Sequence, residues 1–227
     1  MPDDVPESHS HFDPLVHLNQ PDHPDAVAEA RARAGRAVRD IGHALVGHHA
    51  PIEVLDRLTA QLDALTAELE PGERRVRTMG GNSPEWGNDP ADGEIMTTYD
   101  ERPVSGRSSP WGLDLVIRRD GEEVTAEVTL RAAHEGAPGR SHGGVVAALF
   151  DDIYGFVLAI RKQPAFTGEL TVRYEAGIPI GVPMVARVRL ESQEGRKLFM
   201  TGELTADGAV LARSRATFIT IPEYRLA

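Results

Sequence analysis

The stretch from residue 139 to residue 155, GRSHGGVVAALFDDIYG, holds residue types that an acyl-transfer reaction needs. Its apolar spacing predicts a helix from about Gly143 to Arg161, with His142-Gly143-Gly144 at the N-terminal turn. Backbone N–H groups in such a turn have no partner within the helix and lie at the positive end of its dipole. They could therefore donate hydrogen bonds to a carbonyl oxygen and hold it as it becomes an oxyanion.

Two adjacent carboxylates follow in the same predicted helix. The residues three and four positions from Asp151 are mostly glycine and alanine, so Asp151 lies on a stripe of small residues that a ligand or another backbone can approach. Asp152 lies about 100° further round the axis, beside the bulky apolar stripe. Asp151 is therefore the better candidate for chemistry, and Asp152 is interpreted as structural.

A structural interpretation of these residues stays open beside the catalytic one. A glycine pair before a helix usually forms a turn, and most aspartates within helices are solvated or paired. Nine histidines also invite a metal interpretation, but adjacent His48 and His49 cannot easily bind one ion together, and no acid stands at ligand spacing in a rigid element. The sequence therefore predicts neither a metal nor a redox cofactor.

Composition limits the class of protein. The chain has 227 residues, 41% hydrophobic and 26% charged, enough for one large domain or a smaller domain with an extension. It has no cysteine, which excludes disulfides and thiol chemistry and fits a cytoplasmic protein. A net charge of −11 disfavours nucleic acid and anionic membranes as partners. The sequence has no continuous apolar run of about 18 residues, so we expect no membrane span.

The N-terminal third is predicted to be organised apart from the rest. Residues 1–24 lack periodicity and are interpreted as a mobile arm. Residues 25–77 hold two amphipathic helices separated near Pro51, expected to form a hairpin that packs on itself, on the main domain or on a partner subunit. Residues 78–93 are rich in Gly, Asn, Asp and Pro, which predicts a linker. The apolar stripe of the first helix consists of Val27, Ala34, Val38, Ile41 and Leu45.

From residue 94 the apolar spacing is typical of strands, apart from the central helix. Alternation on both sides of Asp120-Gly121 predicts a β-hairpin, after a possible short strand at 94–99. Four strand-like runs follow the helix, at 165–175, 183–192, 197–205 and 210–221. Turn dipeptides join the last three into an antiparallel meander. One helix against one long antiparallel sheet is an α+β arrangement.

The motif HGGVVAALFDD, with Asp151 nine residues after His142, resembles the signature of hotdog-fold acyl-CoA thioesterases. The resemblance is to the PaaI-like branch, which includes the mammalian thioesterase-superfamily-member proteins. The flanks EGAPGRSHGG and TGELTVRYEAGIPIG and the C-terminal meander also match, so the resemblance covers residues 94–227. It implies a hotdog fold, in which a long antiparallel sheet wraps around one helix. It also implies a homodimer or a dimer of dimers, with active sites at the subunit interface.

Position in the motif implies a role for each site residue. Asp151 would act as general base on water or as nucleophile, and the Gly144 N–H would polarise the thioester carbonyl. His142 and Gly143 would shape that turn. Thr167, sixteen residues after Asp151, matches a Ser or Thr of relatives that helps to position water from the other subunit.

The sequence departs from the family pattern at one position, and the resemblance also implies a substrate. Gly136 stands where some relatives carry an Asn or Gln that contributes to the oxyanion site, so backbone N–H groups alone would serve here. Arg173 and Tyr174 could contact the nucleotide part of acyl-CoA. The implied activity is hydrolysis of acyl-CoA to free acid and CoA. The alternative is a non-catalytic acyl-CoA-binding or regulatory module, since some hotdog proteins sense acyl-CoA through an attached helical domain.

Overall fold

One antiparallel sheet and one helix form the body of the protein. The computed structural model describes residues 10–12, 15–17, 19, 22–79 and 90–221. The six strands of the sheet follow the order β5-β6-β10-β11-β12-β9, and every neighbouring pair is antiparallel. Their bounds are β5 Val116–Asp120, β6 Glu123–Thr129, β9 Ala165–Tyr174, β10 Pro183–Glu194, β11 Lys197–Ala206 and β12 Ala209–Thr220.

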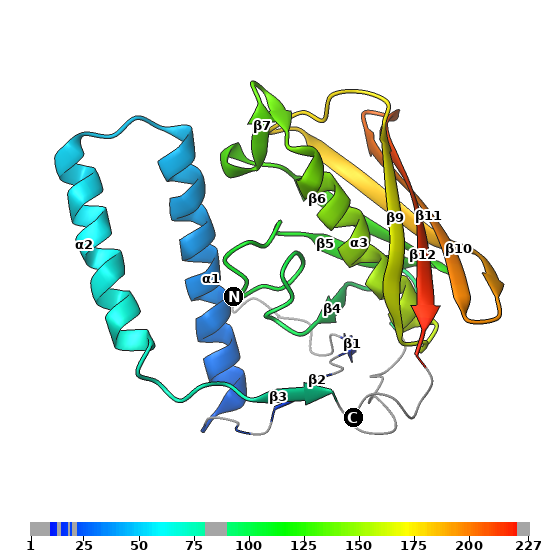
Figure 1. Ribbon diagram of the computed structural model, residues 1–227, viewed down its shortest axis with the longest axis horizontal. Coiled ribbons are helices and arrows are strands. Elements are labelled where there is room, and N and C mark those ends of the chain that lie inside the picture. Colours follow the sequence, from blue (N-terminus) through cyan, green and yellow to red (C-terminus); the bar gives the residue numbers. More distant parts are fainter. Residues whose placement is uncertain (1–9, 13–14, 18, 20–21, 80–89, 222–227) are drawn as a thin grey trace, which may run out of the picture.

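Helix α3 (Gly143–Ile160) lies across one face of this sheet and supplies the centre of the core (Figure 1). Its Leu149, Phe150 and Ile153 are fully buried. Gly202 of β11 makes room for the Phe150 ring, because a Cβ atom there would lie 3.0 Å from Phe150 Cε1. Among the described residues, α3 is the one helix long and apolar enough to cross a membrane, and half of it is buried within the protein.

The predicted α+β architecture is confirmed, with its long antiparallel sheet against one helix. The helix ends one residue earlier than predicted, and the four strands after it lie within two residues of the predicted ranges. The first strand of the hairpin is shorter than the alternation of Leu113 and Leu115 suggests. Asp114 has a φ of 51°, a left-handed conformation that interrupts an extended strand, so β5 begins only at Val116.

Short strands join segments that are far apart in the sequence. Strand β1 (Ser10–Phe12) pairs in parallel with β4 (Met96–Thr98), and β2 (Leu15–His17) pairs antiparallel with β3 (Arg77–Met79). The described part of residues 1–24 therefore contains strands where the sequence suggested an arm. Three-residue strands depend on distant partners, so local periodicity does not reveal them. Most of the predicted linker, residues 78–93, lies outside the described residues.

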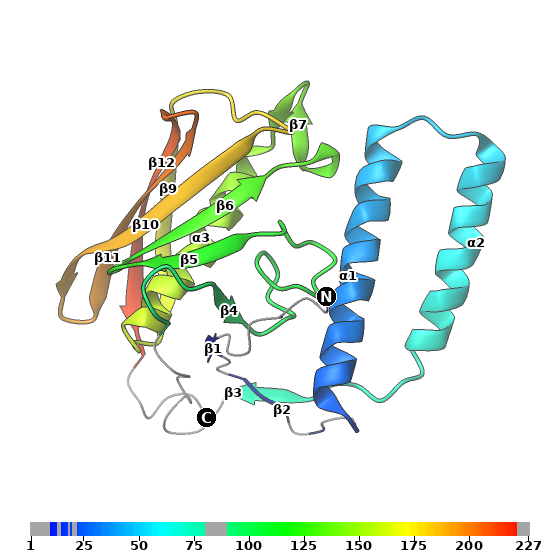
Figure 2. The same ribbon diagram turned by 180° about the vertical axis from the view of Figure 1, so that it is seen from behind.

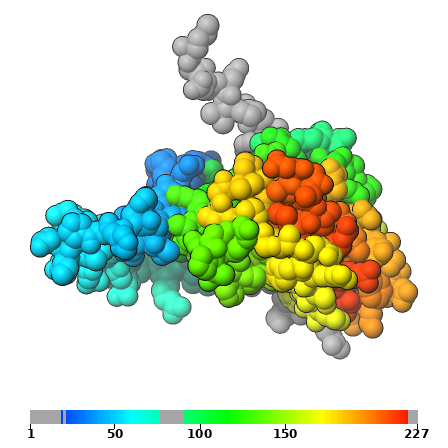
Figure 3. Space-filling model, turned by 90° about the horizontal axis from the view of Figure 1, so that it is seen from above, coloured from blue at the N-terminus to red at the C-terminus, as the bar shows by residue number. Residues whose placement is uncertain are grey.

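Two helices stand beside the body, with α1 (Pro24–Gly47) between the body and α2 (Ile52–Leu69) (Figures 1 and 2). The buried residues of α1 are Gly35, Arg39 and His43, whereas Val38 and Leu45 of its apolar stripe are 47% and 51% exposed. No residue of α2 is buried. Seen from above, α2 forms the outer end of the molecule (Figure 3). Of the packing arrangements expected for the helix pair, α1 packs on the main domain.

Candidate active site

Asp151 and Thr167 meet beside the edge strand of the sheet. The Thr167 Oγ1 hydroxyl donates a hydrogen bond to Asp151 Oδ1 at 2.7 Å. Both residues are exposed, although the next three residues of α3 after Asp151 are buried. The structure therefore brings together the carboxylate and the hydroxyl that the sequence singled out, at a position open to solvent.

A β-bulge places Thr167 on the face of the sheet that carries α3. The register of β9 against β12 shifts at Gly168. Leu170 and Val172 pack against the core, so strict alternation would also turn Gly168 and Phe166 inward. The extra residue reverses that alternation, so that Thr167 contacts the helix and Phe166 is 61% exposed. A small irregularity of the backbone thus makes the hydroxyl available to Asp151.

The turn at the start of α3 is capped by its own histidine. His142 is the N-cap, and its Nδ1 accepts a hydrogen bond from the Gly144 N–H at 3.0 Å. The N–H group expected to polarise a carbonyl is therefore engaged by His142 in this structure. The Gly143 N–H, one residue earlier, donates to no acceptor among the described residues. This turn can offer two donors, one directly and one after His142 rotates away.

The two residues expected to contact a nucleotide lie on opposite faces of β9. Tyr174 Oη donates to the Gly143 carbonyl oxygen at 2.6 Å, and partial burial raises the pKa of this phenol. Arg173 points to the outer face of the sheet, where its Nε lies 3.1 Å from Glu175 Oε1. It lines a hollow of about 600 Å³ that includes neither Asp151 nor the α3 turn. The structure brings Tyr174 to the candidate site and places Arg173 away from it.

Asp152 forms a buried ion pair, as its structural interpretation requires. It is 7% exposed, and Arg102 Nε donates to its Oδ1 at 2.7 Å. The guanidinium also lies 4.9 Å from the centre of the Phe156 ring. Gly155 leaves space for it, since a Cβ atom there would lie 2.1 Å from Arg102 Nη2. Arg102 is 50 residues from Asp152 in the sequence, so helical spacing does not reveal this partner, and Gly155 is the one local signal of it.

The carboxylate and the donor turn lie on one side of α3 but not within reach of one carbonyl group. Gly144 and Asp151 are seven residues apart, which is two helical turns and about 10 Å along the axis. A reacting carbonyl must lie about 3 Å from its donors and about 3 Å from the attacking group. A single copy of α3 therefore carries the N–H donors and the carboxylate of an acyl-transfer site, but holds them too far apart to act on one carbonyl group.

The part of the chain that holds these residues is similar to known proteins. Residues 139–212 match the family model described as thioesterase superfamily. They include the α3 turn, Asp151, Thr167 and Tyr174. This segment of the chain is therefore similar to the thioesterase superfamily.

The chain is also similar to solved structures and curated proteins. A crystal structure of a thioesterase superfamily protein is 25% identical, with a TM-score of 0.69, and the match covers 90% of this chain and all of that chain. Acyl-coenzyme A thioesterase THEM5 of Mus musculus is 33% identical over 89 residues, 38% of this chain and 36% of that protein. Acyl-coenzyme A thioesterase THEM4 of Xenopus laevis is 31% identical over 87 residues, 38% of this chain and 39% of that protein. The matches thus span little more than a third of these curated relatives.

Proposed function

We propose that this protein is a thioesterase that hydrolyses acyl-CoA thioesters to a free acid and CoA. The observation that carries the proposal is the hydrogen bond from Thr167 to Asp151, which orients an exposed carboxylate on a half-buried helix. Similarity to curated proteins named acyl-coenzyme A thioesterases supports the choice of substrate.

Asp151 is the group that activates the attack. Thr167 occupies Oδ1, which leaves Oδ2 to accept a proton from water as the water oxygen bonds to the thioester carbon. The carbon–sulfur bond then breaks, CoA leaves as the thiol after protonation, and the acid is released. Direct attack by Asp151, through an anhydride that water then hydrolyses, gives the same products. Both routes need the ionised carboxylate.

The start of α3 stabilises the oxyanion. The Gly143 N–H is directly available, and the Gly144 N–H becomes available when a substrate oxygen displaces His142 Nδ1. One donor of this kind lowers the barrier by about 3–4 kcal/mol. Gly136 carries no side chain that could add a further donor.

A second copy of the chain completes the site. The two-turn separation along α3 supports this, because the Asp151 of one copy and the turn of another could face the same carbonyl. Strand β9 is at the edge of the sheet, next to Asp151, and an exposed edge of ten residues is suited to pairing with another chain. Sedimentation equilibrium tests the dimer. The expected mass is twice the chain mass of 24.6 kDa.

The activity is tested by thiol release from acyl-CoAs of varied chain length and ring content, with the full chain. Release of CoA with at least one substrate is the expected result. A non-catalytic binding or regulatory function remains the second candidate, because α2 has an apolar stripe and no buried residue, as expected of a contact surface. Calorimetric binding of acyl-CoA without release of thiol would favour this second function and reject hydrolysis.

A further inference from the structure

The buried face of α1 contacts the domain through specific polar groups. Gly35, Arg39 and His43 lie four residues apart on this face. Gly35 lets the helix backbone approach the loop before β5, where a Cβ atom would lie 2.5 Å from the Ser108 carbonyl oxygen. The helix is therefore held by close backbone contact and hydrogen bonds rather than by its apolar stripe.

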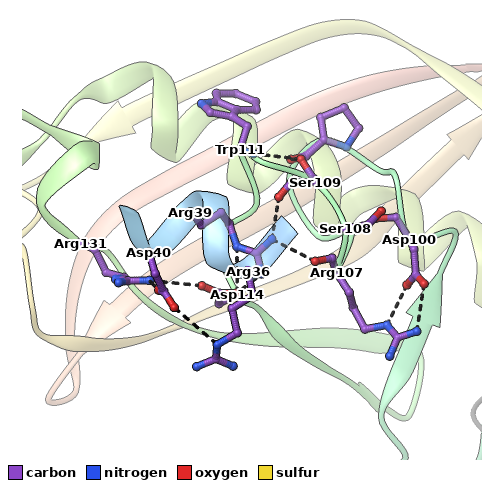
Figure 4. Close-up of polar contacts among 11 residues, drawn as sticks. Arg36, Arg39, Asp40, Asp100, Arg107, Ser108, Ser109, Trp111, Asp114 and Arg131 are labelled. Atoms are coloured by element: carbon purple, nitrogen blue, oxygen red, sulfur yellow. Dashed lines mark hydrogen bonds and ion pairs between the residues drawn. The ribbon is translucent and has the colours of Figure 1, made fainter. Parts of the chain in front are cut away.

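Arg39 fixes the middle of α1 on this loop (Figure 4). Its Nη1 donates to the carbonyl oxygens of Ser109 at 2.6 Å and Arg107 at 3.0 Å. Its Nη2 donates to Asp114 Oδ1 at 2.6 Å. Because Arg39 is only 6% exposed, moving α1 would leave buried polar groups without partners. These contacts hold α1 in one position.

His43, one turn later, contacts the 3-10 helix η1 (Ala132–His134). Its Nδ1 accepts a hydrogen bond from the Ala133 N–H at 3.0 Å, and its ring packs edge-on against His134 with the centroids 4.6 Å apart. The Nδ1 atom of His134 accepts from the Arg131 N–H at 2.9 Å. Since both Nδ1 atoms accept, both rings are neutral and carry their proton on Nε2. Two imidazoles thus hold the backbone of η1.

The same backbone holds the turn at the start of α3. After η1 the chain forms a small hairpin of β7 (Glu135–Ala137) and β8 (Arg140–Ser141), which leads back to His142. The His134 carbonyl oxygen accepts a hydrogen bond from the His142 N–H at 2.8 Å. Gly136 lies against the same residue, since a Cβ atom there would lie 2.8 Å from His142 Cα. His142 then caps α3 through the Gly144 N–H.

We propose that His43 is a positioning residue for the thioesterase site, acting through His134 on the turn that presents the Gly143 and Gly144 N–H groups. Helix α1 is then part of the catalytic scaffold, although it lies outside residues 139–212. The inference rests on the proposed function for its kinetic consequences. A displacement of about 1 Å at a catalytic site can lower a rate about 100-fold, so loss of one of several contacts is expected to lower kcat about tenfold.

The test compares three substitutions of His43 in the full chain. His43→Ala removes the acceptor and the ring. His43→Asn places an oxygen near the position of Nδ1 and keeps the bond from Ala133, whereas His43→Gln places its oxygen near Nε2. We expect kcat for acyl-CoA hydrolysis to fall about tenfold in the Ala and Gln variants, with KM within about twofold, and to be largely restored in the Asn variant.

A matched control separates positioning from general docking of the helix. Glu29→Ala removes the 2.7 Å ion pair between Glu29 and Arg107 near the other end of α1, far from η1. It is expected to leave kcat within about twofold of the wild type, since exposed ion pairs contribute little. An equal fall of kcat in Glu29→Ala and His43→Ala would overturn the proposal.

Hydrogen–deuterium exchange gives a readout that does not depend on activity. His43→Ala and His43→Gln are expected to increase exchange in residues 131–145 but not in β10 to β12, and His43→Asn to restore protection. The proposal is overturned if a folded His43→Ala variant keeps both this protection and kcat, or if Asn restores neither. If the alanine variant fails to fold, the comparison of Asn with Gln decides. If the wild type hydrolyses no acyl-CoA, the proposed function fails, while exchange still decides whether His43 holds the turn.

Discussion

The stability of the protein should fall between pH 8 and pH 5 because of His134. This imidazole is 7% exposed, and its burial, with His43 and Arg131 nearby, lowers its pKa from 6.5 to about 4. Burial likewise lowers the pKa of His43, with Arg131 and Arg39 lowering it further and Asp114 and Asp40 opposing the shift. Below pH 6.5 the unfolded chain therefore binds a proton at His134 that the folded protein does not.

The magnitude follows from the two pKa values. The free energy of unfolding is unaffected by this group above pH 6.5 and falls as the pH drops toward 4. A folded pKa of about 4 against 6.5 corresponds to a loss of about 2 kcal/mol at pH 5 and about 3 kcal/mol below pH 4. His43 adds a loss of the same sign.

Urea unfolding at pH 8 and pH 5 measures this loss. His134→Asn is the reference, because its oxygen can accept from the Arg131 N–H in place of Nδ1 but does not titrate. Between the two pH values the wild type should lose about 2 kcal/mol more than the variant. Equal losses in the two proteins would refute the argument that His134 is neutral and buried against α1.

Three further substitutions test the packing and the site. Asp152→Asn leaves Arg102 as an unpaired buried cation, so the free energy of unfolding in urea should fall by about 3–5 kcal/mol; a loss below about 1 kcal/mol would contradict a buried pair. Gly35→Ala forces a Cβ atom against the loop backbone and should lower the free energy of unfolding by about 1–3 kcal/mol. Gly42→Ala is the control on the same helix, because a Cβ atom there meets nothing within 4 Å, and it should be neutral or stabilising in the same assay. Thr167→Val removes the hydrogen-bond donor to Asp151 and should lower kcat about 10- to 100-fold, while Thr167→Ser should retain most activity. Equal rates in both variants would reject a role for the hydroxyl.

Features set by local spacing were predictable from the sequence. The central helix and the four strands after it follow from apolar periodicity, because helical and strand faces repeat at different intervals. The same geometry separated the two acids of α3. Asp151 is exposed and Asp152 is buried, as their positions 100° apart on the helix indicate. The role of Thr167 beside Asp151, by contrast, is predicted by the family resemblance and not by local spacing.

Features set by contacts between distant segments were not predictable. The contact face of α1 is polar because Arg39 donates to loop carbonyls, whereas an apolar pattern highlights Val38 and Leu45. The bulge at Gly168 depends on the register of β9 against β12, and register is not encoded in one strand. The capping of Gly144 by His142 depends on one side-chain rotamer. The bulge and the cap both lie at the candidate site.

The rate of acyl-CoA hydrolysis by Asp151→Asn tests most directly whether Asp151 is the catalytic group. Asp207→Asn is the matched control, since it makes the same change in an exposed turn with a φ of 47°, which asparagine tolerates. Loss of a general base or nucleophile should lower kcat at least about 100-fold while the protein stays folded and its association state is unchanged, and the control should keep the wild-type rate. A folded Asp151→Asn variant that hydrolyses acyl-CoA at the wild-type rate would contradict the assignment of this carboxylate as the catalytic group.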